Sequence, residues 1–322
     1  MKTERPPSAA AARRLAIPLL LLIGCAVLAG WGLWQAARSG AEGMGAGGEN
    51  GTEARPAPPA AAAAGAAGEP EAAAPEPVRR QRLRVLARYP HDPESFTQGL
   101  LLHGGHLYES TGRYGLSRLR RVEIESGRVL AERPLPEDWF GEGLALVPGE
   151  GGGRLVQLTW LEGVAPVWSL DGFERLGEHR YQGEGWGLCH DATVPGGRLP
   201  MTDGSSRLTF RDPATFAATG SVEVTLDGRP VQMLNELECL PDGRVLANVL
   251  GSDLIVEIAP ATGHVTAILD ASGLLTPAER AGADVLNGIA HDPADGTLLI
   301  TGKLWPWVFR VEREGADEST PR

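Results

Sequence analysis

Two ionisable side chains, Glu142 and Lys303, are the first candidates for chemistry in this chain of 322 residues. Glu142 lies in the sequence Phe-Gly-Glu-Gly, where an isolated Glu would ordinarily be a solvated carboxylate at the end of a strand. In an enclosed site beside aromatic rings, the same carboxylate would have a raised pKa and could transfer protons near neutral pH. Lys303 is either a surface lysine packed on an aromatic ring or a cation that stabilises developing negative charge.

Tryptophans and amides are the next candidates. Trp160 and Trp186 are ordinarily core side chains, but two tryptophans at the ends of neighbouring repeats would form an aromatic wall. Gln98 and Asn235 could be turn or strand-end amides, and neither identifies a site by itself. These residues form a site only if the fold brings distant segments together.

A short repeated motif provides that convergence. Its central residues, at positions 99, 143, 187, 237 and 288, are separated by 44, 44, 50 and 51 residues. A turn and a second apolar strand follow each copy, which predicts hairpins in register. Further turns close the first four units, at Ser126-Gly127, Asp171-Gly172, Asp212-Pro213 and Thr262-Gly263.

Four strands in each unit of about 40 to 50 residues are typical of propeller blades. We therefore expect residues 82–315 to form an all-β domain, a five-bladed β-propeller, with six blades or a sandwich as alternatives. The fifth unit ends near Glu312 after three strands. The unassigned strand Leu83–Tyr89 would supply its outer strand and close the ring.

The innermost strands of a propeller run side by side, so equivalent positions meet at one end of the central axis. One such position holds Gln98, Glu142, Trp186 and Asn287, with Asn235 one residue before it. A second equivalent position holds Gly112, Trp160, Gly204, Leu250 and Lys303. The repeat therefore predicts that the candidate carboxylate, cation and tryptophans lie together.

The N-terminal quarter has a different composition. No charged side chain occurs from Leu15 to Trp34, so residues 15–36 are expected to form a transmembrane signal anchor, with residues 1–14 cytoplasmic by the positive-inside rule. A cleaved signal peptide, or a lipobox ending at Cys25, is the alternative. Residues 37–81, rich in Ala, Pro and Gly, predict a disordered linker, and residues 316–322 a disordered tail. The all-β domain would then be membrane-anchored on the extracytoplasmic, periplasmic side.

Several classes of function are excluded or disfavoured. The formal net charge of −11 and the lack of a basic stripe argue against a nucleic-acid partner. No Ser-His-Asp arrangement, paired Cys or His ligand spacing, or phosphate loop is apparent. Cys189 and Cys239 could pair in an oxidising compartment. Because neighbouring inner strands would hold them too far apart, free thiols are the expectation, and pairing stays open.

The motifs resemble those of the plant-type and bacterial glutaminyl-peptide cyclotransferases, also called glutamine cyclotransferases. The resemblance extends from about Tyr89 to Arg310, and its strength lies in the order and spacing of motifs that are individually weak. They include Phe96–Leu100, Tyr108–Gly112, Phe140–Leu144, Leu158–Trp160, Gly185–Leu188, Asn235–Glu238, Leu286–Ala290 and Thr301–Lys303.

This resemblance implies an enzyme on a five-bladed propeller that converts the N-terminal glutamine of peptides or proteins to pyroglutamate and releases ammonia. Glu142 would be the catalytic acid and base. The other site residues would be Phe96, Gln98, Phe140, Trp160, Trp186, Asn235 and Lys303. Leu250 stands where another tryptophan of the family is expected. No organic cofactor is implied, and a divalent ion on the channel axis would be structural.

The implied chemistry is intramolecular. The α-amine attacks the side-chain carboxamide carbon of the same residue, so the enzyme must orient the substrate and move protons. Glu142 would pass a proton from the amine to ammonia, and Lys303, with Asn235 or Gln98, would stabilise the oxyanion. Two rivals remain: a metal-dependent lactonase using Glu142, Asp203, Asn235 and Asn287, and a non-catalytic propeller that binds exported peptides.

Overall fold

The computed structural model describes residues 77–315. The expected anchor at 15–36, almost all of the expected linker and the expected tail lie outside the described residues. Within residues 77–315, no helix is both long and apolar enough to cross a membrane. The described part is all-β, with only one short α-helix, α2 (Pro277–Arg280), and one 3-10 turn, Glu150–Gly152.

The first two repeats each form a separate four-stranded antiparallel sheet. The first contains β2 (Thr97–His103), β3 (His106–Thr111), β4 (Arg118–Glu123) and β5 (Val129–Pro134). The second contains β6 (Gly141–Val147), β7 (Arg154–Thr159), β8 (Val164–Ser169) and β9 (Arg175–Arg180). Gly127 and Gly172 adopt positive φ angles of 67° and 81° in the turns that close these sheets, as turns of this kind require.

The third repeat departs from the expected four strands. Its sheet contains only β10 (Leu199–Met201), β11 (Arg207–Arg211) and β12 (Ala218–Glu223). The innermost segment pairs with it through isolated bridges, Leu188 with Met201 and Asp191 with Arg198. Pro200 accounts for the broken ladder, because its carbonyl accepts from the Cys189 N–H but it has no N–H to donate in return.

The last two repeats belong to one ten-stranded sheet. One part contains β15 (Leu234–Cys239), β16 (Val245–Val249), β17 (Leu254–Ala259) and β18 (His264–Asp270), with β13 (Thr225–Leu226) and β14 (Arg229–Pro230) at its edge. The other contains β19 (Leu286–His291), β20 (Leu298–Gly302), β21 (Trp307–Gly315) and β1 (Arg79–Pro90). The antiparallel pairing of β1 with β21 confirms that the N-terminal strand completes the last unit. A parallel pairing of β1 with β18 joins the two parts.

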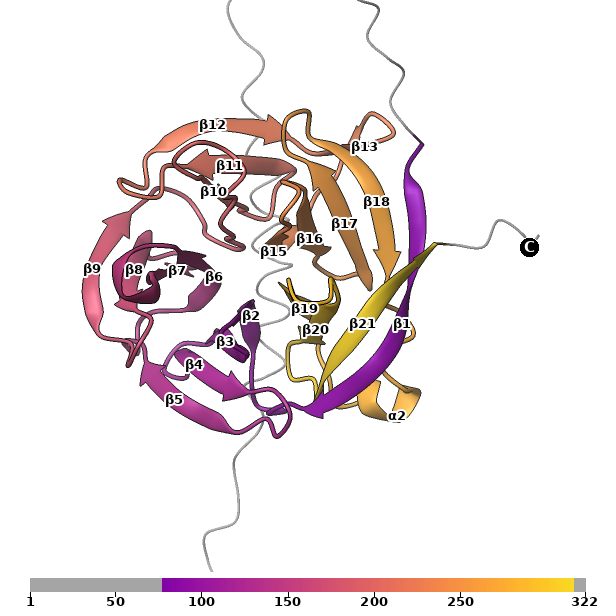
Figure 1. The fold of residues 1–322 in the computed structure, drawn as a ribbon, viewed down its shortest axis with the longest axis horizontal. Helices are drawn as coiled ribbons and strands as arrows, with labels where there is room; N and C mark the ends of the chain where they lie inside the picture. The colour runs from indigo at the N-terminus through magenta and orange to yellow at the C-terminus, as the bar shows by residue number, and fades with distance from the viewer. Residues whose placement is uncertain (1–76, 316–322) are drawn as a thin grey trace, which may run out of the picture. The chain divides into compact units, whose positions relative to one another are not determined.

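Figure 1 shows the sheets arranged around a common centre, with β2, β6, β15 and β19 innermost and β5, β9 and β12 at the periphery. The motif glycines explain how the inner segments come so close. A Cβ on Gly99 would lie 2.7 Å from the Leu144 nitrogen, and one on Gly143 would lie 2.5 Å from the Leu188 nitrogen. Only glycine leaves room for this approach of one backbone to the next.

The apolar core lies between neighbouring sheets. Leu101 and Tyr108 of the first sheet pack with Leu144 and Leu155 of the second, and other clusters join the later sheets in the same way. The first sheet also packs on the last, where Leu100 and Leu107 are clustered with Ala290, Leu299 and Val308. Burying these side chains stabilises each sheet against its neighbours, so the inner strands hold fixed relative positions.

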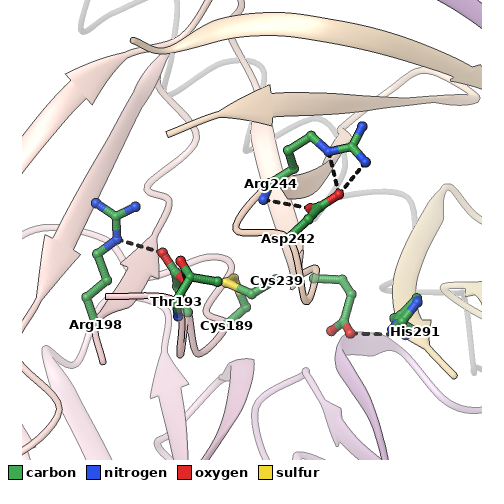
Figure 2. Close-up of a disulfide and its surroundings, with 9 residues drawn as sticks. Cys189, Thr193, Arg198, Cys239, Asp242, Arg244 and His291 are labelled. Atoms are coloured by element: carbon green, nitrogen blue, oxygen red, sulfur yellow. Dashed lines mark hydrogen bonds and ion pairs between the residues drawn. A yellow bond between two sulfur atoms is a disulfide. The ribbon is translucent and has the colours of Figure 1, made fainter. Parts of the chain in front are cut away.

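Cys189 and Cys239 form a disulfide, with their Cα atoms 5.5 Å apart (Figure 2). The expectation of free thiols was wrong. Gly187 lies against the Asn235 carbonyl and the Leu237 side chain with no room for a Cβ. The cysteines follow Gly187 and Leu237 by two residues each, so this close approach brings them within bonding range.

Candidate active site

A chain of hydrogen bonds links three inner strands at the predicted convergence point. Asn287 Nδ2 of β19 donates to Gln98 Oε1 of β2 at 3.1 Å, and Gln98 Nε2 donates to Glu142 Oε1 of β6 at 2.9 Å. All three side chains are buried. Residues 189 positions apart in sequence therefore share one polar network, as the repeat predicted for this position.

β-bulges determine the direction in which these side chains point. In the first sheet, the pairing register of β2 with β3 shifts between Thr97 and Gly99. In the second sheet, the register of β6 with β7 shifts between Gly141 and Leu144. Matching shifts occur in β15 and β19, around Asn235 and Asn287. A bulge inserts an unpaired residue and turns its side chain away from the regular alternation, which is common beside active sites. Each candidate amide or carboxylate of these four strands lies at such a bulge.

Glu142 is 4% exposed, and burial raises its pKa well above the ordinary value for a glutamic acid. The nearby Lys303 lowers this pKa, whereas the negative charges of Glu184 and Glu162 raise it further. Because the second carboxylate oxygen is not needed by Gln98, it remains available to a ligand. A buried carboxyl group with a raised pKa suits proton transfer near neutral pH.

Lys303 follows β20 and is also buried. Its Nζ lies 4.8 Å from the centre of the Phe96 ring, and its backbone is fixed by hydrogen bonds with Val285 and Asp284. Burial lowers the pKa of Lys303, while the carboxylates of Glu142 and Asp284 raise it. Among the described residues, no salt bridge or side-chain hydrogen bond involves Nζ, so this donor faces the Glu142 region without a fixed acceptor.

Four half-buried aromatic rings accompany this pair. Phe140 packs edge-to-face on Phe96 and on Trp160, with ring centres 6.2 Å and 5.6 Å apart. Trp186 reaches the group through Glu184, whose Oε2 accepts hydrogen bonds from the indole nitrogens of Trp160 at 2.7 Å and Trp186 at 2.9 Å. The Glu142 cluster is the name used below for Phe96, Phe140, Trp160, Trp186 and Glu184, together with Gln98, Glu142 and Lys303.

Gly112 and Gly204 belong to the same equivalent position of the repeats as Trp160 and Lys303, and they leave room for two of these rings. A Cβ on Gly112 would overlap the Phe140 ring, and a Cβ on Gly204 would lie 2.6 Å from the Trp186 ring. Gly204 also has a φ of +81°, which favours glycine. The mixture of residue types at this position therefore has a steric reason, because glycine in one repeat accommodates an aromatic ring that faces it.

Within residues 77–315, no side-chain hydrogen bond joins Asn235 to the neighbouring Glu142 cluster. Asn235 is buried, its carbonyl accepts from Thr202 Oγ1, and its side-chain Oδ1 has no partner among the described residues. A buried amide oxygen without a partner is uncommon and indicates a ligand-facing group. Leu250 is half-buried, and its N–H donates to the Met233 carbonyl.

The structure thus brings together seven of the eight sequence-predicted residues through hydrogen bonds, ring contacts and the charge interaction of Glu142 with Lys303, with Asn235 as the exception. It also adds three residues that sequence reasoning missed, Glu162, Glu184 and Tyr114, and it links Asn287 of the predicted repeated position to Gln98. Tyr114 donates to Glu162, and burial together with this carboxylate raises the Tyr114 pKa to about 12. Glu184 lies in the sequence Gly-Glu-Gly-Trp, but nothing there reveals that its carboxylate reaches two indoles.

A divalent ion would need several oxygen ligands grouped around one point. Within residues 77–315, no three His, Cys, Asp or Glu side chains are grouped to hold a metal. Glu236, a second buried carboxylate on the inner strands, already accepts from the N–H groups of Leu100 and Ile289. Asp203, a proposed ligand in the lactonase alternative, is exposed and accepts from Ser205. The exposed Asp203 does not suit the buried site that the lactonase alternative would need, whereas the buried Oδ1 atoms of Asn235 and Asn287 both lack a partner among the described residues.

Comparisons with known proteins agree with one another. The sequence model of a family described as glutamine cyclotransferase matches residues 59–313. A glutaminyl-peptide cyclotransferase of Arabidopsis thaliana is 39% identical over 244 residues, which are 74% of this chain and 73% of that protein. The crystal structure of Myxococcus xanthus glutaminyl cyclase is 42% identical, with a TM-score of 0.65, and the match covers 75% of this chain and 100% of that one.

Proposed function

Because the chain belongs to the glutamine cyclotransferase family, we propose that the Glu142 cluster is the active site in which an N-terminal glutamine is cyclised. The protein converts the N-terminal glutamine of peptides or proteins to pyroglutamate and releases ammonia. The observation that carries the assignment of the site is the buried carboxyl group of Glu142, held by Gln98 and faced by Lys303 and a group of aromatic rings.

Glu142 would act first as a base. The substrate's neutral α-amine attacks its own side-chain carboxamide carbon, and the N–C bond that forms closes a five-membered ring. Gln98 occupies Glu142 Oε1, so Oε2 is the oxygen proposed to take the amine proton. The resulting carboxylic acid then gives this proton to the departing nitrogen, which leaves as ammonia when the C–N bond breaks. The raised pKa of Glu142 supports both steps.

Lys303 would stabilise the oxyanion of the tetrahedral intermediate. Its Nζ lies over the Phe96 ring, and the carboxylates of Glu142 and Asp284 partly offset the lowering of its pKa by burial. A preorganised donor in a partly desolvated site is worth about 10²-fold to 10³-fold in rate. Asn235, whose buried Oδ1 has no partner among residues 77–315, is proposed to hold a polar group of the substrate from the other side.

The half-buried faces of Phe140, Trp160 and Trp186 would contact the aliphatic part of the glutamine side chain. Such contacts hold the substrate in the folded conformation needed for ring closure. The same requirement gives a chemical control. An N-terminal asparagine is one carbon shorter, and attack by its amine would require a strained four-membered ring.

The finer architecture belongs to the same proposal. We infer five blades, each built from one repeat, with β1 as the outermost strand of the fifth. The separate four-stranded sheets, the bulges at equivalent inner positions and the central convergence in Figure 1 support this count. The parallel β1–β18 pairing then represents a contact between adjacent blades.

Attachment to a membrane is proposed from the sequence. The uncharged stretch from Leu15 to Trp34 supports an anchor that places the domain on the extracytoplasmic side, where exported peptides with N-terminal glutamine would be the substrates. Fractionation of cells into membrane and soluble parts tests the attachment, and protease access to the intact cell surface or periplasm tests the side.

The proposed active site is tested with Glu142→Gln in the full-length protein. Ammonia release from a glutamine-initiated peptide is followed in a coupled assay, with an asparagine-initiated peptide as substrate control. We expect kcat to fall by about 10²-fold or more, because the amide cannot accept the amine proton. The exposed Glu174, changed to Gln, is the matched control and should keep full activity. Unchanged turnover in Glu142→Gln would contradict the assignment of the base, and a peptide-binding module would show no turnover at all.

A further inference from the structure

Glu184 joins two tryptophans that come from different sheets. Trp160 directly follows β7 of the second sheet, whereas Trp186 precedes the bridge from Leu188 to the third. One oxygen, Glu184 Oε2, accepts both indole N–H groups, at 2.7 Å and 2.9 Å. A hydrogen bond to an ionised carboxylate is stronger than one between neutral groups, so this single atom fixes the edges of two rings.

The local backbone holds the carboxylate in place. Gly183 has a φ of +83°, and Gly185 packs against the Tyr181 hydroxyl and the Thr159 carbonyl with no room for a Cβ. The N–H of Gly185 donates to the Trp160 carbonyl at 3.0 Å. The position of Glu184 is therefore set by its two flanking glycines and a backbone bond to the neighbouring unit.

Each ring is also held on a second side. Trp186 lies against Gly204, where no Cβ would fit, and Trp160 packs edge-to-face on Phe140. Steric contact on one side leaves a ring free to tilt, whereas a hydrogen bond at the indole nitrogen sets its orientation. Glu184 thus completes the placement of both faces proposed to contact the glutamine side chain.

Resting on the proposed function, we infer that Glu184 is a positioning residue of the cyclisation reaction, which orients Trp160 and Trp186 through one carboxylate oxygen and adds its negative charge to the surroundings of Glu142.

The charge has a separate consequence from the hydrogen bonds. The ionisable groups that act on Glu142 are Lys303, which favours its ionised form, and Glu184 and Glu162, which disfavour it. The hydroxyls of Tyr114 and Tyr181 lie close enough for Glu142 to raise their pKa values. Removing the charge of Glu184 should lower the pKa of Glu142, so that the base is ionised and active at lower pH.

Two substitutions separate geometry from charge. Glu184→Gln keeps an oxygen that can accept both indole N–H groups but removes the charge. Glu184→Asp keeps the charge but withdraws the oxygen by one methylene. Glu174→Gln is the control for losing an exposed carboxylate. For each full-length variant, kcat and KM for a glutamine-initiated peptide are measured across the acidic limb of the pH profile.

We expect Glu184→Asp to raise KM about tenfold, which is the fold-change for losing one charged hydrogen bond. The acidic limb of kcat should stay at the same pH. Glu184→Gln should leave KM within about threefold and move the limb to lower pH. A wild-type KM in Glu184→Asp would overturn the positioning role, and an unmoved limb in Glu184→Gln would overturn the role of the charge. Failure of the proposed function is distinguishable, because the wild-type protein would then release no ammonia.

Discussion

The disulfide between Cys189 and Cys239 can be tested quantitatively. Cys239 ends β15, and Cys189 lies on the innermost segment of the third repeat, 50 residues earlier in the chain. In Figure 2 the bond lies beside Thr193 and near the ion pair of Asp242 with Arg244. It therefore ties together two neighbouring repeats close to the segments that carry Trp186 and Asn235.

The expected effect follows from the length of the closed loop. In the chain-entropy account, a cross-link over 50 residues removes about 14 cal/mol/K of entropy from the unfolded chain, which is about 4 kcal/mol at room temperature. With a urea m-value of about 3 kcal/mol/M, reduction should lower the unfolding midpoint by about 1.3 M. Activity below the transition should change little, because Cys189 lies three residues, or roughly 10 Å of extended strand, beyond Trp186.

The measurement compares oxidised and reduced wild-type protein in urea, followed by tryptophan fluorescence and by ammonia release. This comparison removes the cross-link without creating a cavity. A Cys189→Ala/Cys239→Ala variant, which should be indifferent to reductant, controls for effects of the reductant itself. Equal midpoints for the oxidised and reduced forms would refute the reasoning, as would loss of activity in reduced protein that is still folded.

Two further substitutions test the position of the Phe140 ring against Gly112 and the half-buried acid Glu238. Gly112→Ala places a methyl group in the Phe140 ring and should lower kcat/KM about tenfold or more, whereas Gly177→Ala, with open space around its Cβ, should be neutral; equal activities would show that Phe140 need not occupy this position. Burial raises the pKa of Glu238 to about 8 in the folded protein. Above about pH 4.5 this carboxyl group therefore ionises in the unfolded chain before it ionises in the folded protein, and the free energy of unfolding falls as the pH rises to about 8. This loss is worth about 1.4 kcal/mol per unit of pKa difference. Glu238→Gln should reduce the difference in the free energy of unfolding between pH 5 and pH 8, measured with urea, and an unchanged difference would contradict the raised pKa of Glu238.

The sequence was informative where a local pattern has one structural meaning. The spacing of the motif predicted hairpins and the convergence of Gln98, Glu142 and Asn287, and the hydrogen bonds among them confirm that convergence. The completion of the last unit by the N-terminal strand was also predicted and is confirmed. Both follow from register, which turn residues and periodic apolar side chains specify strongly.

Other features depend on distances that spacing cannot give. The disulfide forms because Gly187 lets two backbones approach more closely than ordinary strands. The third unit lacks its fourth strand because Pro200 cannot donate to the ladder, a local effect visible only once the pairing partner is known. Glu184 escaped notice because a carboxylate two residues before Trp186 gives no sign that it also reaches Trp160.

The fourth repeat shows how a departure from the motif supports the site. Here the motif has Glu236-Leu237-Glu238 in place of a central glycine. The buried Glu236 carboxylate accepts the N–H groups of Leu100 at 3.2 Å and Ile289 at 2.9 Å. These residues follow Gln98 and Asn287 by two positions each, so one side chain joins the two strands whose amides lead to Glu142.

Burial and the neighbouring Glu238 raise the pKa of Glu236 well above its ordinary value, whereas the two N–H groups from which it accepts lower this pKa. Among the described residues, the charges that act on Glu142 come from Lys303, Glu184 and Glu162. Glu236 therefore supports the site through the two strands that it joins, and those three side chains set the balance of charge at the proposed base.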